Sequence, residues 1–224
     1  MRRLIPFGVA AAVELVGVAT DNAVLQWLAK PLLAPLLLLW LLRSGRRFDG
    51  FALGLIFATA GDVALLLHGE PAFLAGMGFF LCAQISFIVT FARRKRPPVP
   101  VVAGYLVLWA LANVVLWGPL GELRLPVLGY SLALCLMAAA AAGVSARAAV
   151  GGAFFLVSDL LIGLDAAGTT LPGHGLLVMS TYITALLLLT TAWAAAGGPD
   201  AARRPDRRTD DGGPATLAGE PATH

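Results

Sequence analysis

The sequence predicts an all-α, polytopic membrane protein with eight transmembrane helices and both termini in the cytoplasm. Apolar residues make up 58% of the 224 residues, charged residues make up only 13%, and the mean hydropathy is +0.82. A soluble domain of this size could not cover so much apolar surface with so few charges. The length of the apolar runs and the placement of the basic residues support the same fold class.

Eight apolar runs approach the length of about 20 residues that a membrane-spanning helix needs. They cover residues 4–20, 22–42, 48–67, 71–92, 99–117, 126–142, 147–165 and 172–195, and the first and sixth are the shortest. The first run begins like a signal peptide, but Glu14 interrupts it and "GVATDN" is a mediocre cleavage site. We therefore expect the first run to be a retained helix.

Prolines and glycines occur inside these runs without contradicting the assignment. Pro31, Pro35 and Pro126 lie within or at the start of spans, where neighbouring helices can satisfy the freed carbonyl groups. The frequent glycines and alanines fit close helix packing in lipid. We expect no span to be clearly broken by paired Gly and Pro.

The basic residues fall almost entirely on one side of such a bundle. With the N-terminus in the cytoplasm, fourteen of the sixteen Lys and Arg residues lie in cytoplasmic segments, Arg124 lies outside, and Lys30 lies within a span. The positive-inside rule predicts this asymmetry for an even number of spans. The net charge of +3 thus has a topological cause and does not indicate a nucleic-acid partner.

The chain divides into two parts by composition. Residues 1–196 are expected to form the eight-helix transmembrane domain, and residues 197–224, rich in Pro, Gly, Asp and Arg, a disordered polar cytoplasmic tail. We expect a multi-pass integral membrane protein, which in a prokaryote would lie in the plasma or inner membrane. Cys82 and Cys135 fall within spans and fit small apolar positions better than a disulfide or a metal site.

A short motif occurs in both the third and the seventh run. The segments "GLIFATAGD" at 54–62 and "GGAFFLVSD" at 151–159 share the pattern G-x-x-F-x-x-x-[GS]-D. The two runs are four spans apart and therefore point in the same direction. We treat a parallel repeat of four helices plus four as a hypothesis that this spacing suggests.

Seven polar residues lie at similar depths in the apolar spans, four to ten residues from their outer ends. They are Glu14, Lys30, Asp62, Asn113, Tyr130, Asp159 and Tyr182. An ionisable group near the bilayer centre costs at least about 2.5–3.5 kcal/mol on insertion scales and usually faces a functional cavity. This common depth predicts a buried polar site, and the simpler alternative is a structural Lys–Asp pair between helices.

Two carboxyl groups in such a layer are suited to general acid and general base roles without a cofactor. One carboxyl would remain protonated while the other ionises, and Lys30 would favour the ionised one. We therefore assign candidate catalytic roles to Asp62 and Asp159, and candidate substrate-binding roles to Lys30, Tyr130, Tyr182, Asn113 and Glu14. Either aspartate could be the acid, and Lys30 could instead hold a phosphate group.

Metal and serine chemistry have little support in the sequence. His68 and His174 lie at loop edges and His224 lies in the tail, so no imidazole set falls within the polar layer as a zinc hydrolase would need. Ser158, next to Asp159, fits a helix-contact residue better than a nucleophile. We expect no metal and no cofactor.

Five segments, in order, resemble the YhhN family of eight-helix membrane proteins. They are "AKPLLAPLLLL" (29–39), "FATAGDVALLL" (57–67), "GYSLALCLMAA" (129–139), "GGAFFLVSDLLIG" (151–163) and the tyrosine of "MSTYITALL" (179–187). The resemblance implies that Asp62, Asp159, Lys30, Tyr130 and Tyr182 match recurrent family residues. The fourth span departs from the family, because Gln84 and Phe87 stand where a histidine and a tyrosine are common. The glutamine usual after the final tyrosine is also replaced in "ITA".

The family resemblance implies hydrolysis of the vinyl ether bond of lysoplasmalogens, which yields a fatty aldehyde and glycerophosphoethanolamine or glycerophosphocholine. The expected partners are a lysophospholipid substrate and the bilayer, and the sequence gives no reason to infer an obligate protein partner. Two other functions are compatible with the same polar layer. One is a proton-coupled transporter of a small molecule or lipid, and the other is a hydrolase of another lysolipid ester or amide.

Overall fold

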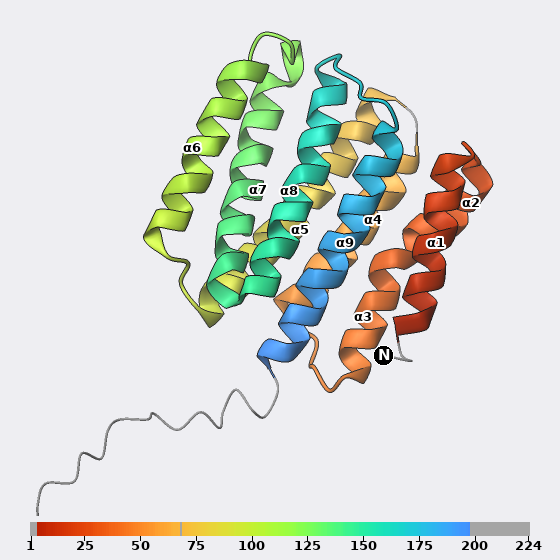
Figure 1. The fold of residues 1–224 in the computed structure, drawn as a ribbon, viewed down its shortest axis with the longest axis vertical. Coiled ribbons are helices and arrows are strands. Elements are labelled where there is room, and N and C mark those ends of the chain that lie inside the picture. Colours follow the sequence, from red (N-terminus) through yellow and green to blue (C-terminus); the bar gives the residue numbers. More distant parts are fainter. Residues whose placement is uncertain (1–3, 68, 198–224) are drawn as a thin grey trace, which may run out of the picture.

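The computed structural model describes residues 4–67 and 69–197, which form a bundle of roughly aligned helices (Figure 1). Within these residues the elements are α-helices joined by loops and two short 3-10 turns, with no strand. The helices are α1 (Ile5–Ala19), α2 (Ala23–Ala29), α3 (Leu33–Arg43), α4 (Gly50–Leu66), α5 (Glu70–Arg94), α6 (Val99–Leu116), α7 (Arg124–Val144), α8 (Ala146–Ala166) and α9 (His174–Ala196). The predicted all-α class is confirmed.

Each predicted apolar run corresponds to a helical segment that begins and ends within a few residues of the predicted bounds. In the described part of the chain, six segments are long and apolar enough to cross a membrane, with α2 and α3 counted together. The remaining two, α1 and α4, have 15 and 17 residues and rise less than the roughly 30 Å of the hydrocarbon core. That all eight segments cross the membrane stays a prediction, and the predicted tail lies, except for Gly197, outside the described residues.

The second predicted span is not one continuous helix. A 3-10 turn, Lys30–Leu32, separates α2 from α3, and it contains Pro31 but no glycine. Pro31 has no N–H to donate, and it stands in the first turn of the 3-10 segment, where this loss is tolerated. The break places Lys30 at a kink between two short helices.

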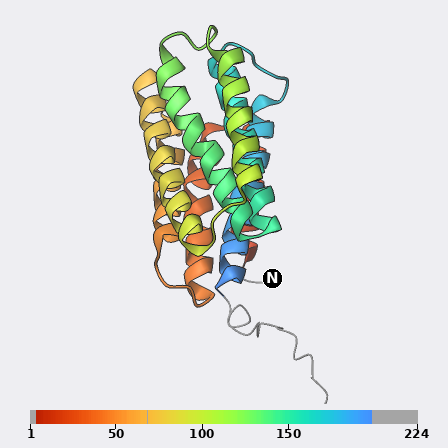
Figure 2. The same cartoon turned by 90° about the vertical axis from the view of Figure 1, so that its left-hand side faces the viewer.

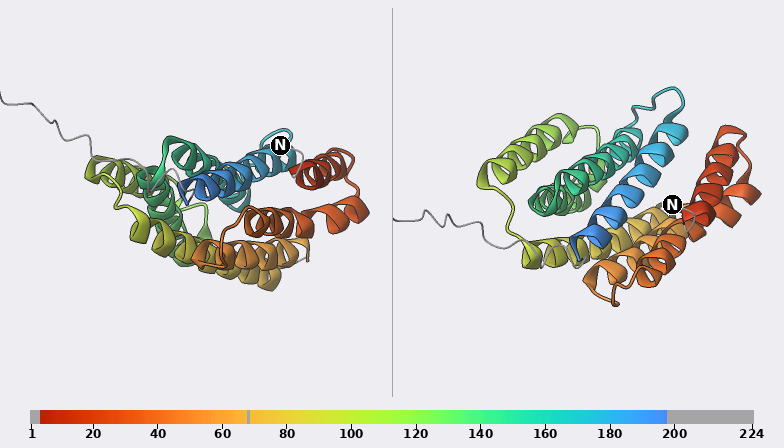
Figure 3. Two further views of the ribbon diagram at one scale, coloured as in Figure 1. Left: turned by 90° about the horizontal axis from the view of Figure 1, so that it is seen from below. Right: turned by 60° about the horizontal axis from the view of Figure 1, so that its bottom comes forward.

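The helices form two layers that α7 joins at one end. Helix α9 contacts α8, α1 and α3, and α4 contacts α3 and α5, which gives the two rows seen along the bundle axis (Figure 3). Helix α7 contacts α5 and α8, whereas α6 packs mainly on α7 at the edge of the bundle (Figure 2). Helix α6 is therefore the least enclosed helix next to the candidate site.

Small residues allow the closest helix contacts. A Cβ atom on Gly54 would lie 2.4 Å from the Phe87 ring, and one on Gly61 would lie 2.7 Å from the Phe80 ring. On α8, a Cβ on Gly151 would lie 3.0 Å from the backbone of Leu189 on α9. Both copies of the glycine-containing motif thus pack closely against the next helix in the sequence.

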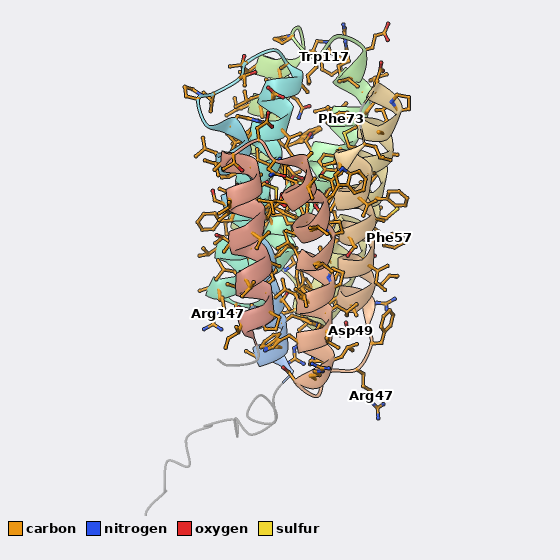
Figure 4. All side chains as sticks on the ribbon, turned by 90° about the vertical axis from the view of Figure 1, so that its right-hand side faces the viewer. Arg47, Asp49, Phe57, Phe73, Trp117 and Arg147 are labelled. Carbon is orange, nitrogen blue, oxygen red and sulfur yellow. The ribbon has the colours of Figure 1, made fainter. Side chains whose placement is uncertain are left out.

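The two ends of the bundle differ in charge. Arg47, Asp49 and Arg147 lie at one end, and Phe73 and Trp117 lie toward the other (Figure 4). The start of α1 and the end of α9 lie at the same end as these arginines (Figure 1). The predicted topology places this arginine-bearing end in the cytoplasm.

Candidate active site

Each helical pass of the described chain contributes one residue to a polar layer. These residues are Glu14 on α1, Lys30 in the 3-10 turn, Asp62 on α4, Gln84 on α5, Asn113 on α6, Tyr130 on α7, Asp159 on α8 and Tyr182 on α9. Seven of them are the predicted site residues. Gln84 was identified in the sequence only as a departure from the family pattern.

Asp62 lies in the interior and is paired with a tyrosine. Its side chain is 1% exposed, and its Oδ2 atom accepts a hydrogen bond of 2.7 Å from the hydroxyl group of Tyr182. The Tyr182 ring packs edge-on against Phe80 and Phe155, with ring centroids 5.8 and 5.7 Å apart. These contacts hold the hydroxyl group toward the carboxylate.

Asp159 forms the second aspartate–tyrosine pair. Its Oδ2 atom accepts hydrogen bonds from the hydroxyl group of Tyr130 and from the side-chain amide of Gln84, the latter at 3.4 Å. Gln84 is completely buried, so the amide adds a fixed donor from α5. In the described part of the chain, no hydrogen bond reaches the other oxygen, Oδ1.

The two pairs belong to one electrostatic network. A charge on Asp62 would act on Asp159, and a charge on Asp159 would act on Tyr182, the hydrogen-bond partner of Asp62. Tyr182 therefore connects the two pairs, because it bonds directly to Asp62 and its environment includes the charge of Asp159.

Lys30 and Glu14 lie on the Asp62 side of this layer. The positive charge of Lys30 acts on both Glu14 and Asp62, but Lys30 forms no ion pair within 4 Å in the described ranges. Glu14 is completely buried. The backbone N–H of Lys30 lies near the Glu14 carboxylate, yet neither oxygen of this carboxylate has a described partner in normal hydrogen-bond geometry.

A cavity of about 320 Å³ lies beside Asp159. Helices α5, α6, α7 and α8 form its walls, together with Leu65 of α4, and most of its lining is apolar. Asp159, Tyr130 and Asn113 line it, whereas Asp62, Tyr182, Lys30 and Glu14 do not. The volume is at the lower end of the roughly 300–1,000 Å³ typical of small-molecule sites.

Asp159 and Tyr130 stand midway along this cavity. Phe73, Leu116 and Ala166 line it toward the end that carries Trp117, and Leu134 and Leu156 line it deeper in the bundle. Phe80 also lines the cavity and contacts Tyr182, so it connects the cavity wall to the Asp62–Tyr182 pair. A long apolar chain with a polar end could lie in the cavity with its junction beside Asp159.

Asn113 and Ser158 have structural contacts of their own. The amide of Asn113 donates to the Ser131 hydroxyl at 3.1 Å and to the carbonyl of Trp109 at 2.8 Å, which ties α6 to α7 at the cavity. Ser158 donates to the carbonyl of Val178 on α9 at 3.1 Å, in agreement with its expected helix-contact role.

Residues with metal-binding side chains do not gather at this layer. Across residues 4–67 and 69–197, no three His, Cys, Asp or Glu side chains come together as a metal centre would require. His174 stands at the start of α9 with Nε2 3.0 Å from the Leu161 carbonyl. His68 and His224 are not among the described residues.

Comparison with known proteins places these observations in a family. The sequence matches the YhhN family over residues 25–193, which include every residue of the polar layer except Glu14. It is 30% identical to lysoplasmalogenase TMEM86B of Rattus norvegicus over 197 residues, which cover 83% of this chain and 81% of that protein. No solved structure matches the chain.

Proposed function

The chain belongs to the YhhN family of membrane proteins, and from this premise we propose that it is an intramembrane hydrolase of lysoplasmalogens. The rat relative is named a lysoplasmalogenase, and most of the folded chain aligns with it. The single observation that carries the proposal is the Asp159 carboxyl group on the wall of an apolar cavity, linked electrostatically to a second buried aspartate.

The cavity fits the apolar part of a lysophospholipid. Its walls are nearly all aliphatic or aromatic, and its polar groups are grouped around Asp159, Tyr130 and Asn113. An alkenyl chain would occupy the apolar part, and the head group would lie toward Leu116 and Ala166. Helix α6 packs mainly on α7, so a lipid could reach the cavity sideways from the bilayer.

The proposed reaction begins with proton transfer to carbon. Asp159 gives a proton to the β-carbon of the vinyl ether, and the ether oxygen stabilises the resulting cation as an oxocarbenium ion. Water adds to this ion and returns a proton to Asp159. The hemiacetal then breaks into a fatty aldehyde and the glycerophospho-alcohol, so the sum is addition of one water molecule.

Asp62 supplies a negative charge near this cation. The charge of Lys30 acts on Asp62 and Glu14, so we assign the ionised role to Asp62 and the proton-donating role to Asp159. The Oδ2 atom of Asp159 accepts from Tyr130 and Gln84, which leaves Oδ1 for the transferred proton. Glycosidases use two carboxyl groups around an oxocarbenium-like transition state in a related way.

The direct test compares three lysolipids that differ only at the first chain linkage. Purified protein is incubated with alkenyl, alkyl and acyl lysolipids, and the products are identified by mass spectrometry. We expect aldehyde from the alkenyl lipid and an unchanged alkyl ether, because the alkyl chain has no double bond to protonate. Cleavage of the acyl lipid alone would instead identify an ester hydrolase.

One observation favours transport as a second candidate function. A broken helix next to buried ionisable residues is a common element of transporters, and the 3-10 turn at Lys30 lies beside Glu14 and Asp62. The same incubation in detergent separates the two functions, because a transporter leaves the lipid chemically unchanged.

A further inference from the structure

A second cavity, of about 560 Å³, lies at the arginine-rich end of the bundle. It is formed by the α3–α4 connection, α4, α5 and the last turns of α9, and we call it the basic groove. Arg46, Arg93 and Arg94 line its polar part, and Leu53, Ile85 and Val89 line its apolar part. It shares no lining residue with the cavity beside Asp159.

Asp49, the acidic residue of the groove, already has internal partners. Its Oδ1 atom accepts from the backbone N–H groups of Phe51 and Ala52 and caps α4. Its Oδ2 atom accepts from the Trp193 indole at 2.9 Å and from Arg46 at 3.4 Å. Asp49 therefore offsets one arginine charge, and the groove retains a positive excess.

The three arginines keep donors that the described part of the protein does not use. The Arg46 guanidinium lies 4.6 Å above the Trp193 ring and uses Nη2 toward Asp49, and its Nε atom is buried without a described partner. Arg94 donates one N–H to the carbonyl of Ala196 at the end of α9. Arg93 makes no hydrogen bond or ion pair within the described residues, so its whole fork of N–H donors is available.

The apolar wall continues from the arginines toward the middle of the bundle. Leu53, Ile85 and Val89 are 39%, 49% and 41% exposed, and they lie one to three turns inward from the helix ends. A groove with guanidinium groups at its end and exposed apolar side chains along its length matches the two parts of a phospholipid. An inorganic anion would use only the first part.

From this geometry we propose that the basic groove binds an anionic phospholipid of the cytoplasmic leaflet, with its phosphate held by Arg93, Arg94 and Arg46. Arginine forks match phosphate oxygens in bidentate geometry. Basic pockets between helices on the cytoplasmic side of membrane proteins bind anionic lipid head groups. The bound lipid would hold the ends of α5 and α9 against the α3–α4 connection.

Arg93→Gln is the most direct test of lipid binding, because Arg93 has no described internal partner whose loss could destabilise the protein. Arg47→Gln is the matched control: it removes the same charge at the same end, from an exposed residue outside the groove. Each basic residue near an anionic membrane surface contributes about fivefold in affinity. We expect Arg93→Gln to weaken binding of phosphatidylglycerol by about fivefold or more and Arg47→Gln to weaken it less than about twofold.

The measurement uses the purified full chain in non-ionic detergent. Phosphatidylglycerol, phosphatidylcholine or inorganic phosphate is titrated, and the rise in unfolding temperature gives the affinity, with native mass spectrometry counting retained lipids. Stabilisation by phosphatidylglycerol that depends on Arg93 supports the proposal. An equal loss in both variants, an equal effect of phosphatidylcholine, or full stabilisation by inorganic phosphate alone would overturn it.

Discussion

At the scale of single residues, Asp159 and Asp62 have different surroundings despite their matching sequence motifs. Asp159 lines the cavity and is bound by Tyr130 and Gln84, whereas Asp62 is enclosed with Tyr182. The positive charge of Lys30 acts on Asp62. Two carboxyl groups in such different surroundings can take the two different roles that acid–base catalysis requires.

We expect Asp159→Asn to abolish hydrolysis while the protein stays folded. The amide keeps the shape and accepts the same hydrogen bonds, but it cannot transfer a proton, and general acid catalysis typically contributes about 10²–10⁴-fold. Aldehyde release from purified protein measures the effect. Asp165→Asn is the control, because Asp165 lies on the same helix, is exposed, and its side chain bonds only to Thr170 among the described residues. Turnover near the wild-type rate in Asp159→Asn would contradict the assignment.

Some site residues could be predicted from the sequence and others could not. Asp62, Asp159, Lys30 and the two tyrosines stand out because they are polar residues in apolar spans. Their pairing could not be derived, because it depends on how each helix is rotated, and these helices are apolar on nearly every face. Gln84 is also a polar residue in an apolar span. Its depth in the span does not predict that its amide bonds to Asp159, because that contact depends on how α5 is oriented relative to α8.

At the scale of single helices, α6 forms the outer wall of the cavity. It contacts α7 along one side, and Asn113 is its one buried residue. Ala112 faces the cavity next to Asn113. A large side chain at Ala112 would fill space that the proposed alkenyl chain needs.

We expect Ala112→Trp to lower kcat/KM by at least about tenfold, which corresponds to a loss of about 1.4 kcal/mol, mainly through a higher KM. Val115→Trp provides the control on the same helix, because Val115 is 73% exposed and does not line the cavity. Steady-state kinetics on both variants give the comparison. Equal kinetics in the two variants would show that the substrate does not use this cavity.

Helix packing makes a separate prediction at Gly54. Because a Cβ there would lie 2.4 Å from the Phe87 ring, Gly54→Ala should destabilise the bundle by about 1–3 kcal/mol, as overpacked cores are. Gly78→Ala, on α5, meets nothing within 4 Å and should leave stability unchanged or higher. Thermal unfolding in detergent measures both. Equal unfolding temperatures would show that α4 and α5 are not so closely packed.

The helices themselves were predictable because long apolar runs are a strong signal, and the bounds agree within a few residues. The 3-10 turn at Lys30 was not predicted, since prolines within spans are compatible with either a continuous or a broken helix. The position of this turn depends on which helices pack against α2 and α3. The hydropathy of a single apolar run does not specify those neighbours.

At the scale of the whole molecule, the charge difference between the ends predicts topology. Arg47 and Arg147 lie at the same end of the bundle, where α1 begins and α9 ends (Figures 1 and 4). We expect a reporter that works only in the cytoplasm, such as a fluorescent protein, to be active when it is fused after residue 224. A reporter that works only outside the cytoplasm should be inactive at the same position. Activity of an alkaline phosphatase fusion at that position would contradict the predicted orientation.

In the proposed reaction, Asp159 delivers a proton to carbon inside the bundle. Hydrolysis in D₂O measures this directly, because the proton donor then carries deuterium. We expect an aldehyde with one deuterium on the carbon next to the carbonyl group at early times, and no such product from Asp159→Asn. An aldehyde released at the full rate without deuterium on that carbon would contradict this proton transfer.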